Sequence, residues 1–264
     1  VKERMNSQGQ IVDELGEESV HALIPLLLEE KVESVAIGLL HAYANPVHER
    51  RVAEILANGL PSISISIGSD VCPEIREYER QSTTCANAYV QPLMGGYLQD
   101  LQSRLAEAGF RCPCMLMTSG GNLITIETAI AHPVRLIESG PAGGAIFSSF
   151  IATSLGLSEV LSYDMGGTTA KICLIDKGQP QTSRTFEVAR EYRFLKGSGI
   201  PLKIPVIEMV EIGAGGGSIA AVDAMKQITV GPNSAGSEPG PACYGRGGTA
   251  PTVTGGGVAL GRIG

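Results

Sequence analysis

The sequence predicts an α/β fold, and three observations support this prediction. Apolar segments with the pattern of buried strands alternate with segments whose apolar residues recur at helical spacing. The chain has 264 residues, of which 43% are hydrophobic and 18% charged, which suits one or two domains with a hydrophobic core. Glycine is unusually frequent, and 20 of the 34 glycines follow Asp164. We therefore expect ordinary helices and strands first, followed by a glycine-rich part built of strands and turns.

The first part of the chain alternates between helix and strand patterns. Helices are predicted for residues 17–28, 46–58 and 79–108, and strands for residues 32–40, 63–67 and 114–117. Pro25 falls inside the first helix and is expected to kink it. Pro46 suits the first turn of the second helix, and Gly109 suits the C-terminal cap of the third.

The second part begins with a helix of small residues and continues with strands. The helix is predicted to start within residues 137–144 and to end near Leu155, and strands are predicted for residues 160–164, 170–176 and 206–212. Small side chains allow this helix to approach a neighbouring backbone closely. The segment 231–245 is too rich in turn residues for regular structure, and we expect a long ordered loop there, which is often functional.

Residues 164–169 (DMGGTT) join two of these strands as a hairpin. Its two glycines let backbone N–H groups close on an anion without a Cβ in the way, and its two threonines add hydroxyl donors. Asp164 lies beside the expected phosphates and is a candidate ligand for Mg²⁺, directly or through water. The alternative is a plain hairpin turn with a turn Asp. The candidate phosphate ligands are Gly166, Gly167, Thr168 and Thr169.

A second glycine-rich segment, residues 213–218 (GAGGGS), follows the strand at 206–212. Such a run allows the backbone to approach a flat ligand or a phosphate, whereas the alternative is a flexible turn. The candidate nucleotide-binding residues here are Gly213, Gly215, Gly216, Gly217 and Ser218.

These motifs together resemble one family, the hydantoinase A/5-oxoprolinase family, which also contains acetone and acetophenone carboxylase subunits. The resemblance covers nearly the whole chain, in family order. It rests on the segments LLHAYANPVHERRVAEIL, PEIREYERQSTT, ESGPAGG, DMGGTTAKICLI, IGAGGGSIA and VGPNSAGSEPGPACYGRGGTAPTVT.

The resemblance implies a partial actin-like ATPase (ribonuclease H-like) fold with a glycine-rich strand-and-turn C-terminal part. Residues 1–88 would be the C-terminal part of the family's N-terminal domain, and residues 89–264 an incomplete ATP-binding domain. The hairpin 164–169 would be the second phosphate hairpin, and residues 213–218 the adenosine loop. The family's first phosphate hairpin has no counterpart here, and the chain begins at Val1 without a Met. We therefore expect a middle fragment with about half an ATP site and little ATP hydrolysis on its own.

Two positions differ from the usual family pattern. Lys171 stands where the family commonly has an Asp, which indicates the carboxylase or lactamase branch. Thr254 is followed by three glycines instead of the usual acidic residue, so the role of that acid is open.

The function implied by the resemblance is ATP-dependent hydrolysis of a cyclic amide, such as a hydantoin or 5-oxoproline, through phosphorylation of its carbonyl oxygen. ATP and Mg²⁺ would be the cofactors, with Asp164 as the metal-side carboxylate and Lys171 as a possible phosphate contact. A hydantoinase B-type subunit or domain would be the partner. One alternative is a subunit of an ATP-dependent ketone carboxylase, which Lys171 favours slightly, and another is a non-enzymatic nucleotide-gated module.

Composition limits the remaining possibilities. A net charge of −7 is the wrong sign for a nucleic-acid surface, and no apolar run reaches the ~18–20 residues that span a bilayer. Six cysteines are too few for a disulfide scaffold, which indicates a cytoplasmic protein. From the charge and the apolar runs we expect neither nucleic-acid nor membrane partners.

His41 and His48 are interpreted as surface or polar-network residues, and Cys112 and Cys114 as packing residues. Residues 74–80 suit either a catalytic or contact loop or an ion-paired helix start.

Overall fold

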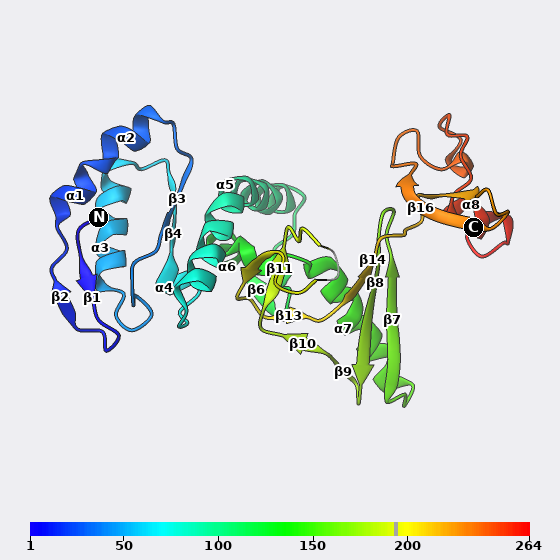
Figure 1. Ribbon diagram of the computed structural model, residues 1–264, viewed down its shortest axis with the longest axis horizontal. Helices are drawn as coiled ribbons and strands as arrows, with labels where there is room; N and C mark the ends of the chain where they lie inside the picture. Colours follow the sequence, from blue (N-terminus) through cyan, green and yellow to red (C-terminus); the bar gives the residue numbers. More distant parts are fainter. Residues whose placement is uncertain (193–194) are drawn as a thin grey trace. The chain divides into compact units, whose positions relative to one another are not determined.

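A computed structural model describes residues 1–192 and 195–264 of the chain (Figure 1). The chain forms two compact units, which are described separately. Unit 1 comprises Val1–Ala142 and Thr182–Val206, and unit 2 comprises Gly143–Gln181 and Ile207–Gly264. Within the described residues, no helix is both long and apolar enough to cross a membrane.

Unit 1 begins with a small α/β arrangement around one apolar cluster. Strands β3 (Ser34–Ile37) and β4 (Ser64–Ile67) pair in parallel, and helix α3 (Val47–Gly59) connects them. The cluster is formed by Val20, Ile37, Val52, Ile55, Leu56 and Leu60. A parallel pair needs such a crossover helix, so this part confirms the predicted alternation of strand and helix.

The remaining N-terminal elements are short. They are β1 (Arg4–Met5), β2 (Ile11–Asp13), α1 (Glu17–His21), α2 (Leu23–Glu29) and α4 (Gly68–Val71). The prediction of one helix kinked at Pro25 is wrong, because the break falls at Ala22 between α1 and α2. Pro25 lies in the first turn of α2, where its missing N–H removes no helical hydrogen bond.

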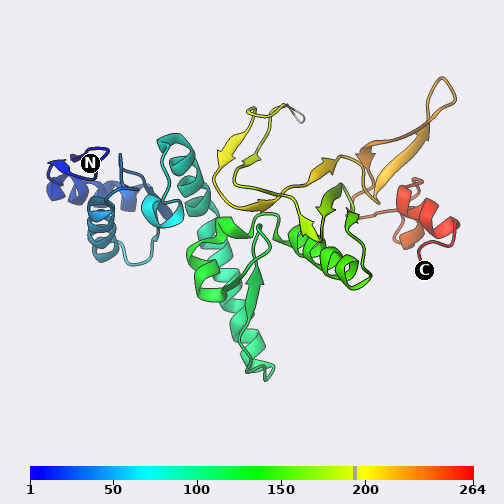
Figure 2. The same cartoon turned by 90° about the horizontal axis from the view of Figure 1, so that it is seen from below.

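Helix α5 (Glu77–Glu107) is the longest element of unit 1, and Gly95 and Gly96 do not interrupt it. It ends as predicted, since Gly109 has a φ of +90° just beyond Ala108. A second apolar cluster, with Leu98, Ile126 and Ala129 at its centre, joins α5 to β5 (Met115–Met117), β6 (Leu123–Thr125) and α6 (Ile126–Ala131). Figure 2 shows α5 along its length with the β5–β6 segment beside it.

A third apolar cluster brings a later part of the chain back to unit 1. Strands β11 (Phe186–Val188) and β12 (Ile200–Leu202) pair antiparallel, and Leu202 is buried with Val71 and with Val134 of the 3-10 helix η1 (Pro133–Leu136). Strand β10 (Thr182–Ser183) pairs with β13 (Val206–Ile207).

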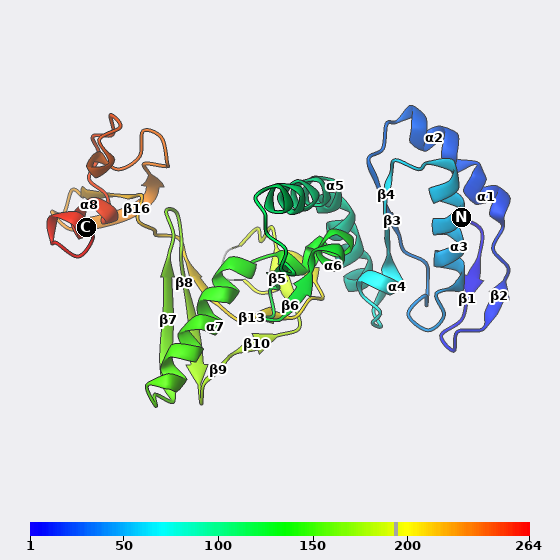
Figure 3. The ribbon, with the colours of Figure 1, turned by 180° about the vertical axis from the view of Figure 1, so that it is seen from behind.

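Unit 2 contains an antiparallel sheet in the order β14-β8-β7, formed by β7 (Glu159–Met165), β8 (Ala170–Asp176) and β14 (Val210–Ile212), with β9 (Gln179–Pro180) paired to β8. Helix α7 (Ser139–Ser154) lies beside β7 and β8 in Figures 1 and 3. The Ser148 hydroxyl contacts that of Ser162 at 3.0 Å, and the Ser149 hydroxyl donates to the Gly178 carbonyl. One sheet face is therefore covered by α7.

The opposite face of this sheet is apolar and exposed. Because side chains alternate along a strand, Leu161, Tyr163 and Met165 share the face opposite Ser162. The register places Leu174 beside Leu161 on the same face. Large exposed apolar patches are uncommon on isolated domains, so this face differs from an ordinary solvated surface.

The last part of unit 2 contains β15 (Ser218–Val222), β16 (Ile228–Ser234), the 3-10 helix η2 (Ala242–Tyr244) and α8 (Val253–Ala259). Two predictions are corrected here. The strand predicted at 206–212 is divided into β13 and β14, and the expected loop at 231–245 is regular at its start, because β16 continues to Ser234 by pairing with β15. The glycines after Thr254 form the first turns of α8, with the Thr252 hydroxyl accepting a hydrogen bond from the Gly255 amide.

Candidate functional site

The hairpin between β7 and β8 forms the predicted turn. The two strands pair throughout, from Glu159 opposite Asp176 to Met165 opposite Ala170, and the Gly166 amide donates to the Thr169 carbonyl at 2.9 Å. Among the described residues, the next three amides, those of Gly167, Thr168 and Thr169, donate no hydrogen bond. Because Gly167 and Thr168 are exposed, these amides are available to an anion.

The glycine at position 167 is not required by the protein's own packing. A Cβ added to Gly167 would have no atom within 4 Å, and its φ lies outside the left-handed region. The fold therefore accommodates a side chain here, and the glycine leaves open space beside the free amides. Glycine at this position would allow a ligand to approach the backbone closely.

Charged residues occupy paired positions on neighbouring strands next to the hairpin loop. Lys171 in β8 is directly opposite Asp164 in β7 and also opposite Glu211 in β14. Asp164 is exposed at the loop end of its strand. In the described part of the chain no three His, Cys, Asp or Glu side chains group as a protein-only metal site. A single carboxylate still suits Mg²⁺, which is commonly held by one or two carboxylates together with water and phosphate oxygens.

The second glycine segment contacts the hairpin directly. The Gly216 amide donates to the Gly166 carbonyl at 2.9 Å, and the Gly217 amide donates to the Gly167 carbonyl at 2.7 Å. A Cβ on Gly215 would lie 2.7 Å from the Gly166 oxygen, so the two backbones could not approach each other with a larger residue there. The structure thus brings together the two glycine-rich segments that the sequence singled out.

The segment 213–218 divides into exposed and buried residues. Gly213 is exposed, whereas Gly215, Gly216, Gly217 and Ser218 are buried. The Ser218 hydroxyl accepts a hydrogen bond from the Gly215 amide at 2.9 Å. Three glycine amides of this segment are therefore engaged within the protein, and the expected role of the segment in nucleotide binding stays a prediction.

Sequence reasoning missed the residues behind this loop. The Thr254 amide donates to the Gly216 carbonyl at 2.8 Å, and the Ala235 amide donates to the Gly217 carbonyl at 2.8 Å. No sequence signal identifies Thr254 as a packing partner of Gly216, although Thr252 has the residue type that begins helices.

Cys173 is the thiol nearest in sequence to the hairpin, on the sheet face covered by α7. It is buried, and burial raises the pKa of its thiol, which disfavours the nucleophilic thiolate. We therefore assign Cys173 to packing.

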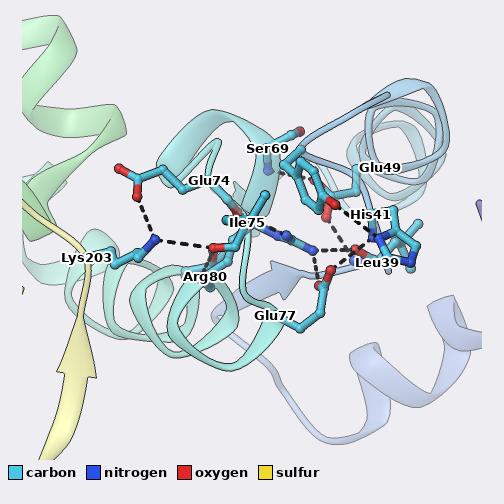
Figure 4. Close-up of polar contacts among 11 residues, drawn as sticks. Leu39, His41, Glu49, Ser69, Glu74, Ile75, Glu77, Arg80 and Lys203 are labelled. Atoms are coloured by element: carbon cyan, nitrogen blue, oxygen red, sulfur yellow. Dashed lines mark hydrogen bonds and ion pairs between the residues drawn. The ribbon is translucent and has the colours of Figure 1, made fainter. Parts of the chain in front are cut away.

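In unit 1, polar residues of the segment 74–80 gather around the buried Arg80 at the start of α5 (Figure 4). The Arg80 guanidinium is fully buried, pairs with Glu77, and donates to the Leu39 carbonyl at 2.8 Å. The remaining carboxylate oxygen of Glu77 accepts a hydrogen bond from the His41 amide at 3.1 Å. These hydrogen bonds connect the loop after β3 to the first turn of α5.

The same region also holds the chain segment after β12. Lys203 Nζ lies 2.6 Å from the Glu74 carboxylate and 3.3 Å from the Ile75 carbonyl (Figure 4). The Lys203 amide donates to the Thr83 hydroxyl at 2.9 Å. Residues 74–80 were expected to form either a catalytic or contact loop or an ion-paired helix start. These contacts agree with an ion-paired helix start, which also contacts other segments of unit 1.

The two histidines interpreted as polar-network residues lie in such networks. His48 Nδ1 is 2.9 Å from a Glu3 carboxylate oxygen, with both side chains buried, and His41 Nδ1 is 3.4 Å from the Tyr43 hydroxyl.

A separate cleft of about 500 Å³ lies in unit 1, with Ser64, Gln91 and Gly96 among its lining residues. None of the predicted site residues lines this cleft.

Comparison with family models gives two matches. Residues 80–264 match the model described as hydantoinase/oxoprolinase, and residues 1–60 match the hydantoinase/oxoprolinase N-terminal region. An uncharacterized protein of Methanocaldococcus jannaschii is 40% identical over 267 residues, which cover all of this chain and 39% of that protein. The alpha subunit of caprolactamase from Pseudomonas jessenii is 38% identical over 260 residues, which cover 98% of this chain and 36% of that subunit.

Solved structures agree with the family comparison. The crystal structure of the ATP-dependent caprolactamase from Pseudomonas jessenii has a TM-score of 0.75 at 36% identity and covers 99% of this chain and 37% of that one. A nucleotide-free structure of acetone carboxylase, from work on ATP-dependent acetone carboxylation, matches with a TM-score of 0.77 at 27% identity. The match covers 99% of this chain and 36% of the acetone carboxylase chain. These likenesses confirm the predicted fold class. The chain spans less than two fifths of the length of each of these relatives.

Proposed function

The chain belongs to the hydantoinase/oxoprolinase family, and from that premise we propose that it supplies a phosphate-binding part of an ATP-dependent enzyme that hydrolyses cyclic amides. One observation carries the proposal. Within the part of the chain that the structure describes, the amides of Gly167, Thr168 and Thr169 in the β7–β8 loop have no hydrogen-bond acceptor, and a Cβ on Gly167 would enter open space beside them. Consecutive backbone N–H groups of this kind suit a phosphate group.

The charged residues of the hairpin suit the same ligand. Thr168 and Thr169 add hydroxyl donors beside the amides, and Lys171 contributes a positive charge that stabilises charge on a transferring phosphoryl group. Asp164 would hold Mg²⁺, which when bound neutralises part of the charge of the phosphates. We propose that Gly213 and the buried glycines that follow it belong to the same nucleotide site, with Gly213 as the exposed member.

The chemistry follows from the inertness of a ring amide toward water. The amide oxygen attacks the terminal phosphorus of ATP, the bond from that phosphorus to the bridging oxygen breaks, and ADP leaves. Water then adds to the activated carbon, and the carbon–nitrogen bond of the ring breaks as the nitrogen takes up a proton, which leaves an acyl phosphate. A second water hydrolyses this acyl phosphate to the ring-opened carboxylic acid and inorganic phosphate. In this scheme the hairpin positions the phosphates and stabilises their charge, and no covalent bond to the protein is needed.

The variant Gly167→Ala tests the phosphate site without disturbing the fold. Because the added Cβ would meet no protein atom, the midpoint of thermal unfolding should stay close to that of the wild type. The affinity for Mg-ATP, measured by calorimetry on the protein at full family length, should fall about tenfold, since the methyl group enters the ligand's space. Gly144→Ala, at an exposed position of α7 that is equally free of neighbours, is the control and should bind as the wild type does. Equal affinity of Gly167→Ala and the wild type would contradict the proposal.

A comparison of two substitutions at Asp164 tests the metal role. If the carboxylate holds Mg²⁺, both Asp164→Asn and Asp164→Ala should lower kcat by about 10²-fold or more, with little change in thermal midpoint. If Asp164 only closes the turn through an Asx-type hydrogen bond, Asp164→Asn should keep both the fold and the rate. Near wild-type turnover of Asp164→Asn in Mg²⁺ would therefore refute the metal role.

A ketone carboxylase is the second candidate, favoured by Lys171 at the position where the family commonly has an Asp. The likeness to acetone carboxylase, with a TM-score of 0.77, supports it, whereas the higher identity to caprolactamase supports the amidohydrolase. ATP turnover stimulated by lactams or hydantoins, compared with turnover stimulated by ketone plus bicarbonate, distinguishes the two.

The relatives also suggest how the protein assembles. The caprolactamase relative is named as an alpha subunit, which supports an assembly with other subunits. We propose that this chain works with a hydantoinase B-type subunit or domain in the cytoplasm. We further propose that the 264-residue chain alone hydrolyses ATP very slowly, because it carries one hairpin of the Asp-x-Gly-Gly-Thr type. Robust Mg²⁺-dependent turnover by the purified chain would overturn this statement.

A further inference from the structure

The segment Gly215–Gly217 lies between the hairpin loop and the last part of unit 2. On one side, the amides of Gly216 and Gly217 donate to the carbonyls of Gly166 and Gly167. On the other side, the carbonyls of Gly216 and Gly217 accept from the amides of Thr254 and Ala235. Each of the two glycines thus links the hairpin to a later segment through its own backbone.

These hydrogen bonds determine which way the hairpin amides point. In a trans peptide the C=O and N–H groups point in opposite directions. The Gly166 carbonyl and the Gly167 N–H belong to one peptide, and the Gly167 carbonyl and the Thr168 N–H belong to the next. Because both carbonyls point toward the glycine segment, the N–H groups of Gly167 and Thr168 point away from it, as free donors.

We propose that Gly216 and Gly217 are positioning residues that orient the phosphate-binding amides of the hairpin, and that the backbone amide at position 254, without its side chain, holds Gly216 in place. This inference rests on the proposed function and assigns the buried glycines a role different from direct contact with the nucleotide. The two peptides are oriented before the ligand arrives, so no binding energy is used to turn them.

Little space is left for a side chain at the two glycines. A Cβ on Gly216 would lie 2.5 Å from the Thr254 hydroxyl oxygen, whereas a Cβ on Gly217 would lie 2.9 Å from the Ser234 hydroxyl oxygen and 3.0 Å from the Gly167 carbonyl oxygen. The three atoms nearest to a Cβ on Gly216 are the Thr254 Oγ1, the Gly166 carbonyl oxygen and the Thr254 Cβ, and the second of these is 3.6 Å away. A methyl group at position 216 therefore conflicts with one removable atom.

This geometry allows a rescue experiment on the protein at full family length, with Mg-ATP as the probe. Gly216→Ala should weaken Mg-ATP binding about tenfold, because the methyl group displaces the amide that holds the Gly166 carbonyl. Gly216→Ala combined with Thr254→Ala should restore the affinity to within about twofold of the wild type. Thr254→Ala alone keeps the backbone hydrogen bond to Gly216 and should bind normally. The control is Gly215→Ala, whose Cβ would meet backbone atoms of Gly166 and Gly167 at 2.7 Å and which Thr254→Ala should not rescue.

Hydrogen exchange of the wild-type protein gives a second measurement if Gly216→Ala does not fold. The amides of Gly216 and Gly217 should exchange slowly with and without nucleotide, and the amides of Gly167 and Thr168 should become protected only when Mg-ATP is added. Unchanged affinity of Gly216→Ala, failure of the double variant to regain affinity, or rapid exchange at Gly216 and Gly217 would each overturn the inference. Such a result would leave the proposed function intact if Gly167→Ala still weakened binding, whereas a wild type that bound no Mg-ATP would refute the proposed function itself.

Discussion

The carboxylate of Glu49 accepts a 2.7 Å hydrogen bond from the amide of Ser69, and the Glu49 side chain is completely buried. Its other oxygen accepts from the Leu39 amide at 2.9 Å. Leu39 follows β3 and Ser69 follows β4, so this carboxylate joins the carboxyl ends of two parallel strands. In α/β sheets this edge commonly binds anionic ligands, and here an internal side chain provides the negative charge.

Replacing Glu49 by Gln should destabilise unit 1 by about 1–3 kcal/mol, the usual cost of leaving a buried group without its partner. The amide of Gln can accept from one of the two backbone N–H groups, but its NH₂ group would face the other donor. Urea denaturation measures the loss. Glu54→Gln is the matched control on the same helix, because Glu54 is exposed and its pair with Arg51 is a surface pair. Equal effects of the two substitutions would show that the buried contacts contribute nothing.

Arg80→Met should destabilise unit 1 more than Arg76→Met does. Arg80 is completely buried and pairs with Glu77, which is 28% exposed, whereas Arg76 is 71% exposed. Breaking a buried ion pair costs about 3–5 kcal/mol, and the partial exposure of Glu77 places this case near the lower end. Thermal unfolding should show the difference between Arg80→Met and Arg76→Met. Arg80→Lys should be only slightly more stable than Arg80→Met, since an ammonium group cannot reproduce the planar set of donors of the guanidinium.

The sequence was sufficient to predict the hairpin and the second glycine segment, because their residue types carry a local meaning. Gly166 and Gly167 between two apolar runs indicate a tight connection in any context. The contact between Gly217 and Gly167 could not be predicted, since hydrogen bonds between distant backbones leave no mark on side-chain type. The roles of Thr254 and Ala235 depend on the same tertiary contacts.

The errors in the fold have local physical causes. Pro25 was expected to kink a helix, but proline is tolerated in a first turn, and α2 begins just before it. Arg76 and Arg80 have the same residue type in one polar motif, yet only Arg80 is buried, because it points to the Leu39 carbonyl. Burial of a charged residue depends on which loop lies beside it, and the motif PEIREYER contains no information about that loop.

Gly96→Ala should stabilise the chain by about 0.5–1 kcal/mol, because glycine in a helix interior loses more backbone entropy on folding than alanine does. Gly96 lies inside α5, and an added Cβ would have no atom within 4 Å. The midpoint of urea unfolding should rise without a change in slope. The contrasting variant is Gly59→Ala, whose Cβ would lie 2.5 Å from an Ile24 methyl carbon and which should not stabilise. If Gly96→Ala leaves the stability unchanged or lowers it, the expectation is wrong. Position 96 then requires glycine for another reason, for example in the neighbouring cleft.

Acid should destabilise unit 1 through His132. Burial lowers the pKa of this imidazole, with a smaller contribution from the nearby Arg135, and Asp70 opposes the shift. In the unfolded chain His132 takes up a proton near the ordinary histidine pKa of about 6.5, whereas the folded protein resists protonation until a lower pH. Between these two values the unfolded state binds more protons, so the free energy of unfolding falls as the pH falls, by up to about 1.4 kcal/mol per pH unit. Above about pH 7 the stability contributed by the neutral imidazole should be fully present.

Urea denaturation between pH 5 and pH 7.5 checks this expectation for wild type and two variants. His132→Gln, which cannot titrate, should show a smaller loss of stability on acidification than the wild type. Arg135→Gln removes the second cause of the shift and leaves burial in place, so its slope with pH should lie between the other two. If all three proteins lose the same free energy over this range, the acid sensitivity of the fold comes from other groups, and burial of His132 has no consequence for stability.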